Sequence, residues 1–168
     1  MVLGMSLPLF TTIHVTISLI AIVSGFIVLF GFFSSKPMNG MTALFLLTTI
    51  LTSVTGFMYP FHGVTPGIIV GVLSLIVLLG AVVARYGMLL AGKARWVYVV
   101  CATIALYFNF FVLVAQSFMK IPALHNLAPN GNEPPFLIVQ VLVLVFFAVA
   151  GYLGVKKFHP FPGSVAKI

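Results

Sequence analysis

Acidic residues are almost absent from this sequence. Its 168 residues include a single Asp or Glu, Glu133, and only 5% of the residues are charged, whereas 62% are hydrophobic. A water-soluble domain of this length needs a charged surface, and this chain has too few charges to form one. The composition therefore predicts a protein that is solvated by lipid.

The sequence has a single cysteine and no carboxylate in its apolar segments. Cys101 is the only cysteine, which excludes an intrachain disulfide and a Cys-rich metal site. No apolar segment contains a carboxylate, which disfavours proton- and sodium-coupled transport. Because the sequence also has no Gly-rich phosphate loop, no nucleophile elbow and no HExxH motif, it gives little support for an enzyme.

Long apolar runs are present instead. Five segments match the ~20 residues that cross a hydrocarbon core ~30 Å thick, and they cover residues 9–33, 41–61, 66–91, 95–120 and 136–156. The first has no basic residue ahead of it and no small-x-small cleavage pattern, so we expect a retained helix rather than a signal peptide. Most connections are short, which predicts one domain over residues 1–168, an all-α integral membrane protein built as a compact bundle.

The basic residues are spread singly beside the apolar segments. This pattern indicates membrane topology rather than a nucleic-acid-binding face, and no nucleic-acid partner is expected. Seven of the eight fall at the first loop, the third loop and the C-terminal tail: Lys36, Arg85, Lys93, Arg95, Lys156, Lys157 and Lys167. The positive-inside rule places that side in the cytoplasm and the N-terminus outside.

Polar residues of the apolar segments gather in the outer half of this expected topology. Such residues turn toward other helices or water, because an unsatisfied polar group in hydrocarbon costs several kcal/mol. We therefore predict an outward-facing polar pocket. The candidate residues are His14, Ser18, Tyr59, His62, Asn109, Gln116, His125 and Gln140.

The segment TGFMYPFHGVTPG, residues 55–67, is expected to connect two helices at the mouth of that pocket. Pro60 should end one helix and Pro66 should open the next. Gly63, Gly67, Gly71 and Ser74 permit close helix contact, which serves either a homo-oligomer or packing within one chain.

Two functional hypotheses follow. The first is a non-catalytic protein, either an accessory subunit of a larger membrane complex or a binder of a small lipophilic ligand such as a lipid or quinone. The alternative is a redox or metal protein that carries haem b or copper through the outer-side histidines His14, His62 and His125. Membrane lipids are expected partners in either case.

Three segments carry a resemblance to a known family: TALFLLTTILTSVTGFMYPFHG, ARWVYVVCATIALYFNFFVLVAQSF and PALHNLAPNGNEPPFLI. Together they resemble a family of small multi-spanning bacterial inner-membrane proteins that has no assigned activity. The resemblance implies a compact helical protein of the bacterial inner membrane. It brings no cofactor and no catalytic residue to this sequence.

Overall fold

The computed structural model describes residues 2–60, 63, 65–161 and 163–165. Five helices are long and apolar enough to cross a membrane, the third of them prolonged by the π-helical turn η1. This confirms the prediction of an all-helical protein with five candidate spans. The elements are α1 (Leu7–Phe33), α2 (Asn39–Gly56), α3 (Pro66–Val82), η1 (Val83–Gly87), α4 (Ala94–Lys120), α5 (Pro122–His125) and α6 (Pro134–Lys157).

The helix starts follow the prolines of the sequence. Three long helices, α1, α3 and α6, carry proline in the first two positions, where the missing N–H leaves no hydrogen bond unmade. Thr65 also caps α3, because its side chain accepts a hydrogen bond from the Ile68 amide at 3.4 Å. Proline position therefore predicts where these helices begin.

Two helix ends differ from the sequence-based expectation. α2 ends at Gly56 rather than near Pro60, because glycine weakens the helix and the amides of Phe57 and Met58 turn back to Val54 and Thr55. The third span does not continue as an α-helix to residue 91. It changes to a π-helical turn at Val83–Gly87 and then enters a connection over residues 88–93.

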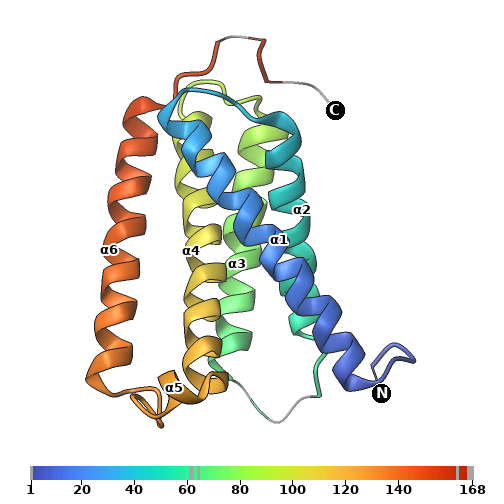
Figure 1. Ribbon diagram of the computed structural model, residues 1–168. Helices are drawn as coiled ribbons and strands as arrows, with labels where there is room; N and C mark the ends of the chain where they lie inside the picture. Colours follow the sequence, from blue (N-terminus) through green and yellow to red (C-terminus); the bar gives the residue numbers. More distant parts are fainter. Residues whose placement is uncertain (1, 61–62, 64, 162, 166–168) are drawn as a thin grey trace.

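α4 lies at the centre of the bundle and contacts each of the other four long helices. α1 crosses the bundle obliquely and packs against α2, α4 and α6, while α6 stands at one edge (Figure 1). α1 and α3 do not contact each other. They are held apart by α2 and α4, which leaves a space that the candidate site occupies.

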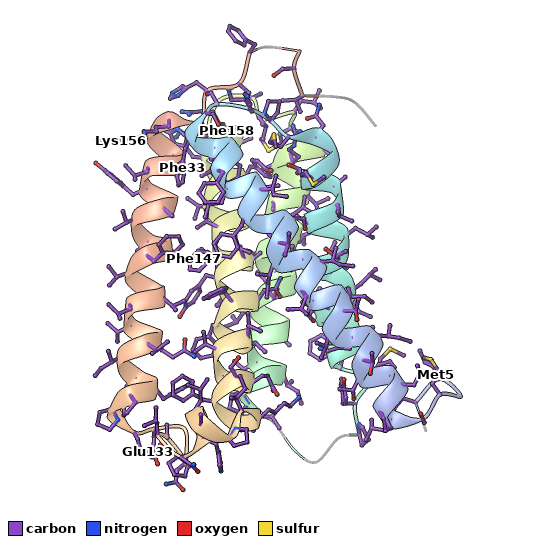
Figure 2. All side chains as sticks on the ribbon, viewed as in Figure 1. Met5, Phe33, Glu133, Phe147, Lys156 and Phe158 are labelled. Atoms are coloured by element: carbon purple, nitrogen blue, oxygen red, sulfur yellow. The ribbon has the colours of Figure 1, made fainter. Side chains whose placement is uncertain are left out.

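The two ends of the bundle differ in charge. The α1–α2 and α3–α4 connections and the C-terminal segment share one end, called the basic end below (Figure 1). Glu133 and Lys120 lie at the opposite end, and Figure 2 shows Glu133 far from Lys156. The basic end holds Lys36, Arg85, Lys93, Arg95, Lys156 and Lys157, while Lys167 lies outside the described residues.

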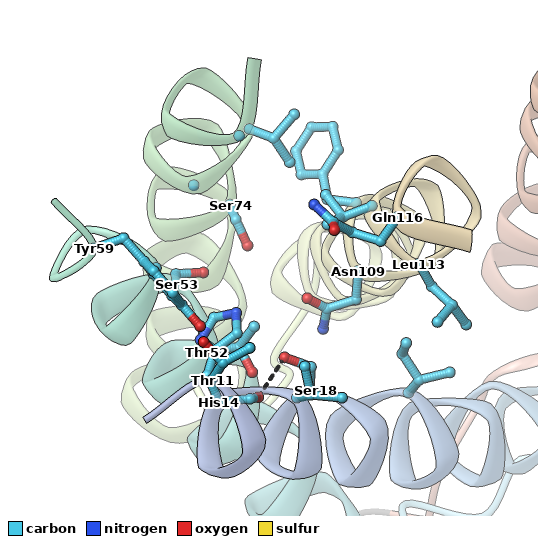
Figure 3. Close-up of a pocket in the computed structure, with 18 of the residues that line it drawn as sticks. Thr11, His14, Ser18, Thr52, Ser53, Tyr59, Ser74, Asn109, Leu113 and Gln116 are labelled. Atoms are coloured by element: carbon cyan, nitrogen blue, oxygen red, sulfur yellow. Dashed lines mark hydrogen bonds between the residues drawn. The ribbon is translucent and has the colours of Figure 1, made fainter. Parts of the chain in front are cut away.

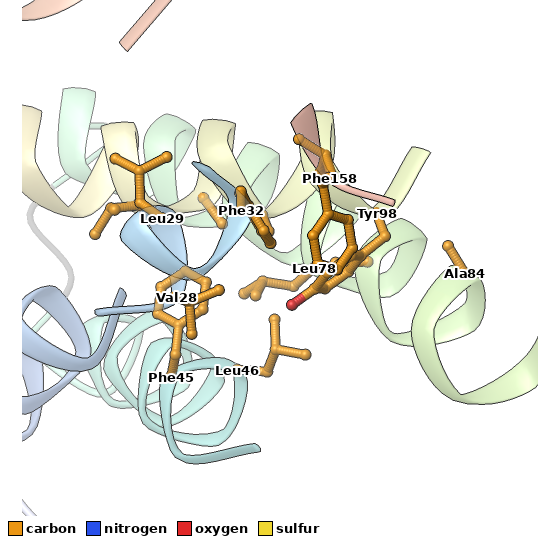
Figure 4. Close-up of a cluster of buried hydrophobic side chains, with 14 of the residues drawn as sticks. Val28, Leu29, Phe32, Phe45, Leu46, Leu78, Ala84, Tyr98 and Phe158 are labelled. Atoms are coloured by element: carbon orange, nitrogen blue, oxygen red, sulfur yellow. The ribbon is translucent and has the colours of Figure 1, made fainter. Parts of the chain in front are cut away.

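A buried aromatic cluster closes the core near the basic end. The Tyr98 ring packs at 5.5 Å from Phe32, and Phe158 packs at 5.0 Å from the same phenylalanine (Figure 4). All three side chains are almost completely buried. The Tyr98 hydroxyl lies 3.1 Å from Thr42 Oγ1, so its polar group is satisfied inside the core. Tight packing at this end contrasts with the open volume at the other.

The outer face of α6 is exposed and apolar, as expected for a helix in contact with lipid. More than half of the surface is exposed for several of its aliphatic side chains, namely Ile138, Val141, Leu142, Val145 and Val149. The hydrocarbon of a bilayer solvates such a face without any loss of hydrogen bonding.

Candidate ligand-binding cavity

A cavity of about 630 Å³ lies between α1, α2, α3 and α4, toward the end opposite the basic end. Its walls are mostly apolar, and α6 contributes no residue to them. The cavity forms where α1 and α3 face each other without contact. Five of the residues predicted from the sequence line it: His14, Ser18, Tyr59, Asn109 and Gln116 (Figure 3).

Two other candidates, Gln140 and His125, are not among the described lining residues. Gln140 is buried, and its Nε2 donates to the Phe111 carbonyl oxygen at 3.2 Å on the α4 backbone. His125 is exposed on α5, within the connection between α4 and α6. Both residues lie on elements that face another side of α4. His62 lies outside the described residues.

His14 is held in one orientation by α2. Its Nδ1 lies 2.7 Å from Thr55 Oγ1, and the Thr55 hydroxyl is itself 2.6 Å from the Leu51 carbonyl oxygen. Since a carbonyl only accepts, we assign the hydroxyl proton to that bond, and in this assignment His14 donates Nδ1–H to Thr55. A neutral His14 therefore keeps the lone pair of Nε2 free to accept a hydrogen bond.

Aromatic contacts fix the imidazole further. The Tyr59 ring meets His14 edge-on, with centroids 5.4 Å apart, and packs against Phe10 at 5.1 Å. Tyr59 lies in the turn that follows the end of α2. Because α2 ends at Gly56, this turn places the tyrosine in the cavity wall. An exposed, wet histidine would lack these contacts.

Asn109 and Ser74 add polar groups deeper in the cavity. Asn109 Nδ2 donates to Thr49 Oγ1 at 3.1 Å, and no described residue donates to its Oδ1. Ser74 is 3% exposed, and its Oγ has no hydrogen-bond partner in the described part of the chain. Figure 3 shows Ser74 and Asn109 on facing walls. A buried hydroxyl without a partner is rare in native proteins and calls for an explanation.

Ser74 was treated in the sequence as a helix-packing residue together with its neighbouring glycines. The structure places Gly67, Gly71 and Ser74 in the cavity wall. A Cβ atom at Gly71 would lie 2.9 Å from the Phe57 ring. Gly71 therefore leaves room for the Phe57 side chain, which follows the end of α2. Spacing of three and four residues indicates the shared face, but it does not indicate whether a helix or a cavity lies opposite.

The cavity reaches polar residues at the end opposite the basic end. Gln116 and Lys120, on the last turns of α4, line it there, and Lys120 is the one Lys or Arg among the described lining residues. Glu133 does not pair with this lysine. Its carboxylate accepts hydrogen bonds from the Asn130 amide and side chain at 3.0 and 2.7 Å and from the Asn132 amide at 3.1 Å.

The structure brings together no metal-ligand set from the residues it describes. Within residues 2–60, 63, 65–161 and 163–165, no three His, Cys, Asp or Glu side chains lie close enough to hold a metal ion. His14 lies in the cavity while His125 is exposed on α5, so these two histidines do not converge. The haem or copper hypothesis also names His62, which lies outside the described residues, so it stays a prediction.

Comparisons with known protein families, with curated proteins and with solved structures find no match for this chain. The functional argument therefore depends on the geometry of the cavity.

Proposed function

We propose that this is a non-catalytic membrane protein that binds a small lipophilic ligand, a lipid or a quinone, in the cavity between α1 and α3. The cavity volume of about 630 Å³ falls within the range of roughly 300–1,000 Å³ for small-molecule sites. Such sites combine apolar walls with a few placed polar groups, which is the composition of this cavity.

The observation that carries the proposal is the unpartnered hydroxyl of Ser74. Leaving a buried polar group without a hydrogen bond costs about 1–3 kcal/mol. Ser74 lines the cavity, and its buried Oγ has no described partner. A ligand oxygen bound there would accept its proton and remove that cost.

The other polar groups suggest the ligand's chemistry. His14 Nε2 and Asn109 Oδ1 are acceptors, Ser74 is a donor, and an apolar tail would occupy the space between α1 and α3. A quinone ring supplies carbonyl oxygens when oxidised and hydroxyl donors when reduced, and both forms match this set. A lipid headgroup with hydroxyl and ester oxygens matches it as well.

The orientation and location belong to the same proposal. The cations of the basic end favour a cytoplasmic position for that end under the positive-inside rule. The N-terminus and the cavity would then face the outer side of a bacterial inner membrane. Assembly into a homo-oligomer or a larger complex stays a prediction, because Gly67, Gly71 and Ser74 are used in the cavity wall.

The test is to extract and identify the lipophilic molecules that copurify with the protein in mild detergent. Gly67→Leu is a blocking variant, because a Cβ at Gly67 meets nothing closer than Thr65 Oγ1 at 3.7 Å and the added chain enters the cavity. Gly40→Leu is the matched control, since Gly40 has open space around it at the basic end. One defined molecule should copurify with the wild type and the control but not with Gly67→Leu. Recovery of bulk membrane lipid alone from all three proteins would refute the proposal.

A further inference from the structure

Arg85 is the one fully buried charged side chain in the described part of the chain. It lies in the π-helical turn η1, at the basic end, and none of its surface is exposed. Its Nη2 donates to Asn39 Oδ1. Its Nε and Nη1 have no hydrogen-bond partner among the described residues. The guanidinium thus retains unused N–H donors inside the protein.

No described side chain near Arg85 supplies a carboxylate to balance this charge. An arginine does not lose its proton in a protein, so burial cannot neutralise it. The only acidic side chain in the sequence is Glu133, at the opposite end of the bundle (Figure 2). The rings of Tyr86 and Tyr98 lie 5.7 Å from the guanidinium carbon and stabilise it in part. They do not neutralise the cation.

The start of α2 lies beside the guanidinium. Asn39, which accepts from Arg85, is the first residue of this helix. The helix has no side-chain cap and no acidic residue in its first turn, so its positive N-terminal dipole is not compensated by the chain. Helix N-termini and guanidinium groups are both recurrent phosphate ligands. Here Asn39 joins the guanidinium to the helix N-terminus, because it starts α2 and accepts from Arg85.

We propose that Arg85 and the N-terminus of α2 form a binding site for a phosphate-type oxyanion. The anion accepts from Nε and Nη1 and supplies the negative charge that the chain lacks. It comes either from the headgroup of an anionic phospholipid or from free phosphate, since basic pockets between membrane helices bind such headgroups. This site is separate from the cavity and does not depend on the proposed ligand.

The C-terminal segment covers the same place. Asn39 uses its Oδ1 for Arg85 and its Nδ2 for the Ser164 carbonyl oxygen at 3.1 Å, so it links the guanidinium to that segment. Because Arg85 is fully enclosed, an anion reaches it only through a local shift of the segments around it. Anion binding should therefore loosen the contact between Asn39 and Ser164.

The test is thermal unfolding of the full chain in lipid nanodiscs under three conditions. These are neutral phosphatidylcholine alone, phosphatidylcholine with inorganic phosphate, and a mixture with phosphatidylglycerol. The wild type should unfold about 3–6 °C higher with an anion present at about ten times its dissociation constant. A higher unfolding temperature with phosphatidylglycerol but not with inorganic phosphate identifies the lipid headgroup as the ligand. A higher unfolding temperature with inorganic phosphate identifies the free ion.

Asn39→Asp is the decisive variant, because it places a carboxylate against Arg85. It should fold, and its unfolding temperature should no longer depend on phosphate or phosphatidylglycerol. Arg85→Met should likewise lose the response if it folds. Lys93→Gln removes an exposed cation of the same end and should respond like the wild type. An equal unfolding temperature of the wild type in all three conditions, or an equal response of Asn39→Asp and wild type, would overturn the proposal.

Discussion

His14 Nδ1 lies 2.7 Å from Thr55 Oγ1, and this hydrogen bond joins α1 to α2 at the wall of the cavity. The two residues are far apart in the sequence, so the bond forms only when the bundle is assembled. It also decides which nitrogen of His14 is available. Nδ1–H is used by Thr55, and Nε2 remains for a ligand.

Removing the Thr55 hydroxyl should release His14 from this orientation. In Thr55→Val, the Nδ1–H tautomer loses its acceptor and the imidazole should populate both tautomers. Nitrogen NMR of the histidine side chain measures this directly. Affinity for a short-chain quinone should fall about fivefold, the equivalent of one hydrogen bond of about 1 kcal/mol. Thr12→Val is the control, because Thr12 is exposed and bonds only the Pro8 carbonyl oxygen. A Thr55→Val protein with unchanged tautomer and affinity would contradict this role.

Asn109 is expected to act in two separable ways. Its Nδ2 binds Thr49 on α2, and its Oδ1 is available to the cavity. Thr49→Val should weaken the helix contact by about 0.5–1 kcal/mol and leave ligand binding intact. Asn109→Leu should weaken the helix contact similarly and also reduce ligand binding. Unfolding in detergent and quinone titration of the two variants separate these effects. Equal ligand affinity in both would show that Asn109 serves packing alone.

Gly25 permits the closest approach of α1 to its neighbours. A Cβ there would lie 2.5 Å from Leu106 Cδ1 on α4 and 2.9 Å from the Phe45 ring on α2, and both of those side chains are buried. Gly25→Ala should therefore destabilise the bundle by about 1–3 kcal/mol through overpacking. Gly40→Ala, with nothing within 4 Å of its Cβ, should have no such effect. Chemical unfolding of the two variants provides the measurement, and equal stability would show that α1 shifts freely.

Glu133 should make the turn before α6 sensitive to acid. Desolvation raises the pKa of Glu133, but the hydrogen bonds donated by Asn130 and Asn132 outweigh it, and the net pKa is below its usual value. The folded-state pKa is lowered, so this stabilisation is complete above the usual glutamate pKa of about 4.3 and is lost as the pH falls through the lowered value. Amide exchange at Asn130 and Asn132 should show protection at neutral pH that disappears in acid. Glu133→Ala should lack the protection at every pH, and a variant as protected as the wild type would contradict the assignment.

Hydropathy and proline position predicted most of the fold, because both act locally. The length of an apolar run is set by the bilayer, and proline in the first turn marks the starts of α1, α3 and α6. The end of α2 at Gly56 and the π-helical turn at Val83–Gly87 were not predicted. The end of α2 follows from a local glycine that was given less weight than Pro60, whereas the π-helical turn packs against α4, and local propensity does not contain such packing.

The helix that carries each polar residue was predictable from the sequence, whereas the rotation of that helix about its axis was not. Asn109 and Gln140 both lie on membrane helices, but Asn109 lines the cavity while Gln140 faces the Phe111 carbonyl. Arg85 shows the same limitation. Its position in the sequence indicates a cation near the membrane surface, and only the packing of η1 against α4 reveals that it is completely buried.

The central claim is that a defined molecule occupies the cavity, and site-specific photo-cross-linking tests it most directly. Leu113, which lines the cavity, is replaced by a diazirine analogue of leucine of nearly the same shape (Figure 3). Leu144, which is half exposed on α6, receives the same replacement as a control for bulk lipid. After irradiation in native membranes, position 113 should carry one adduct of a single mass that is absent at position 144. If both positions carry the same mixture of membrane phospholipids, or position 113 carries no adduct, the cavity has no specific ligand and the account is wrong.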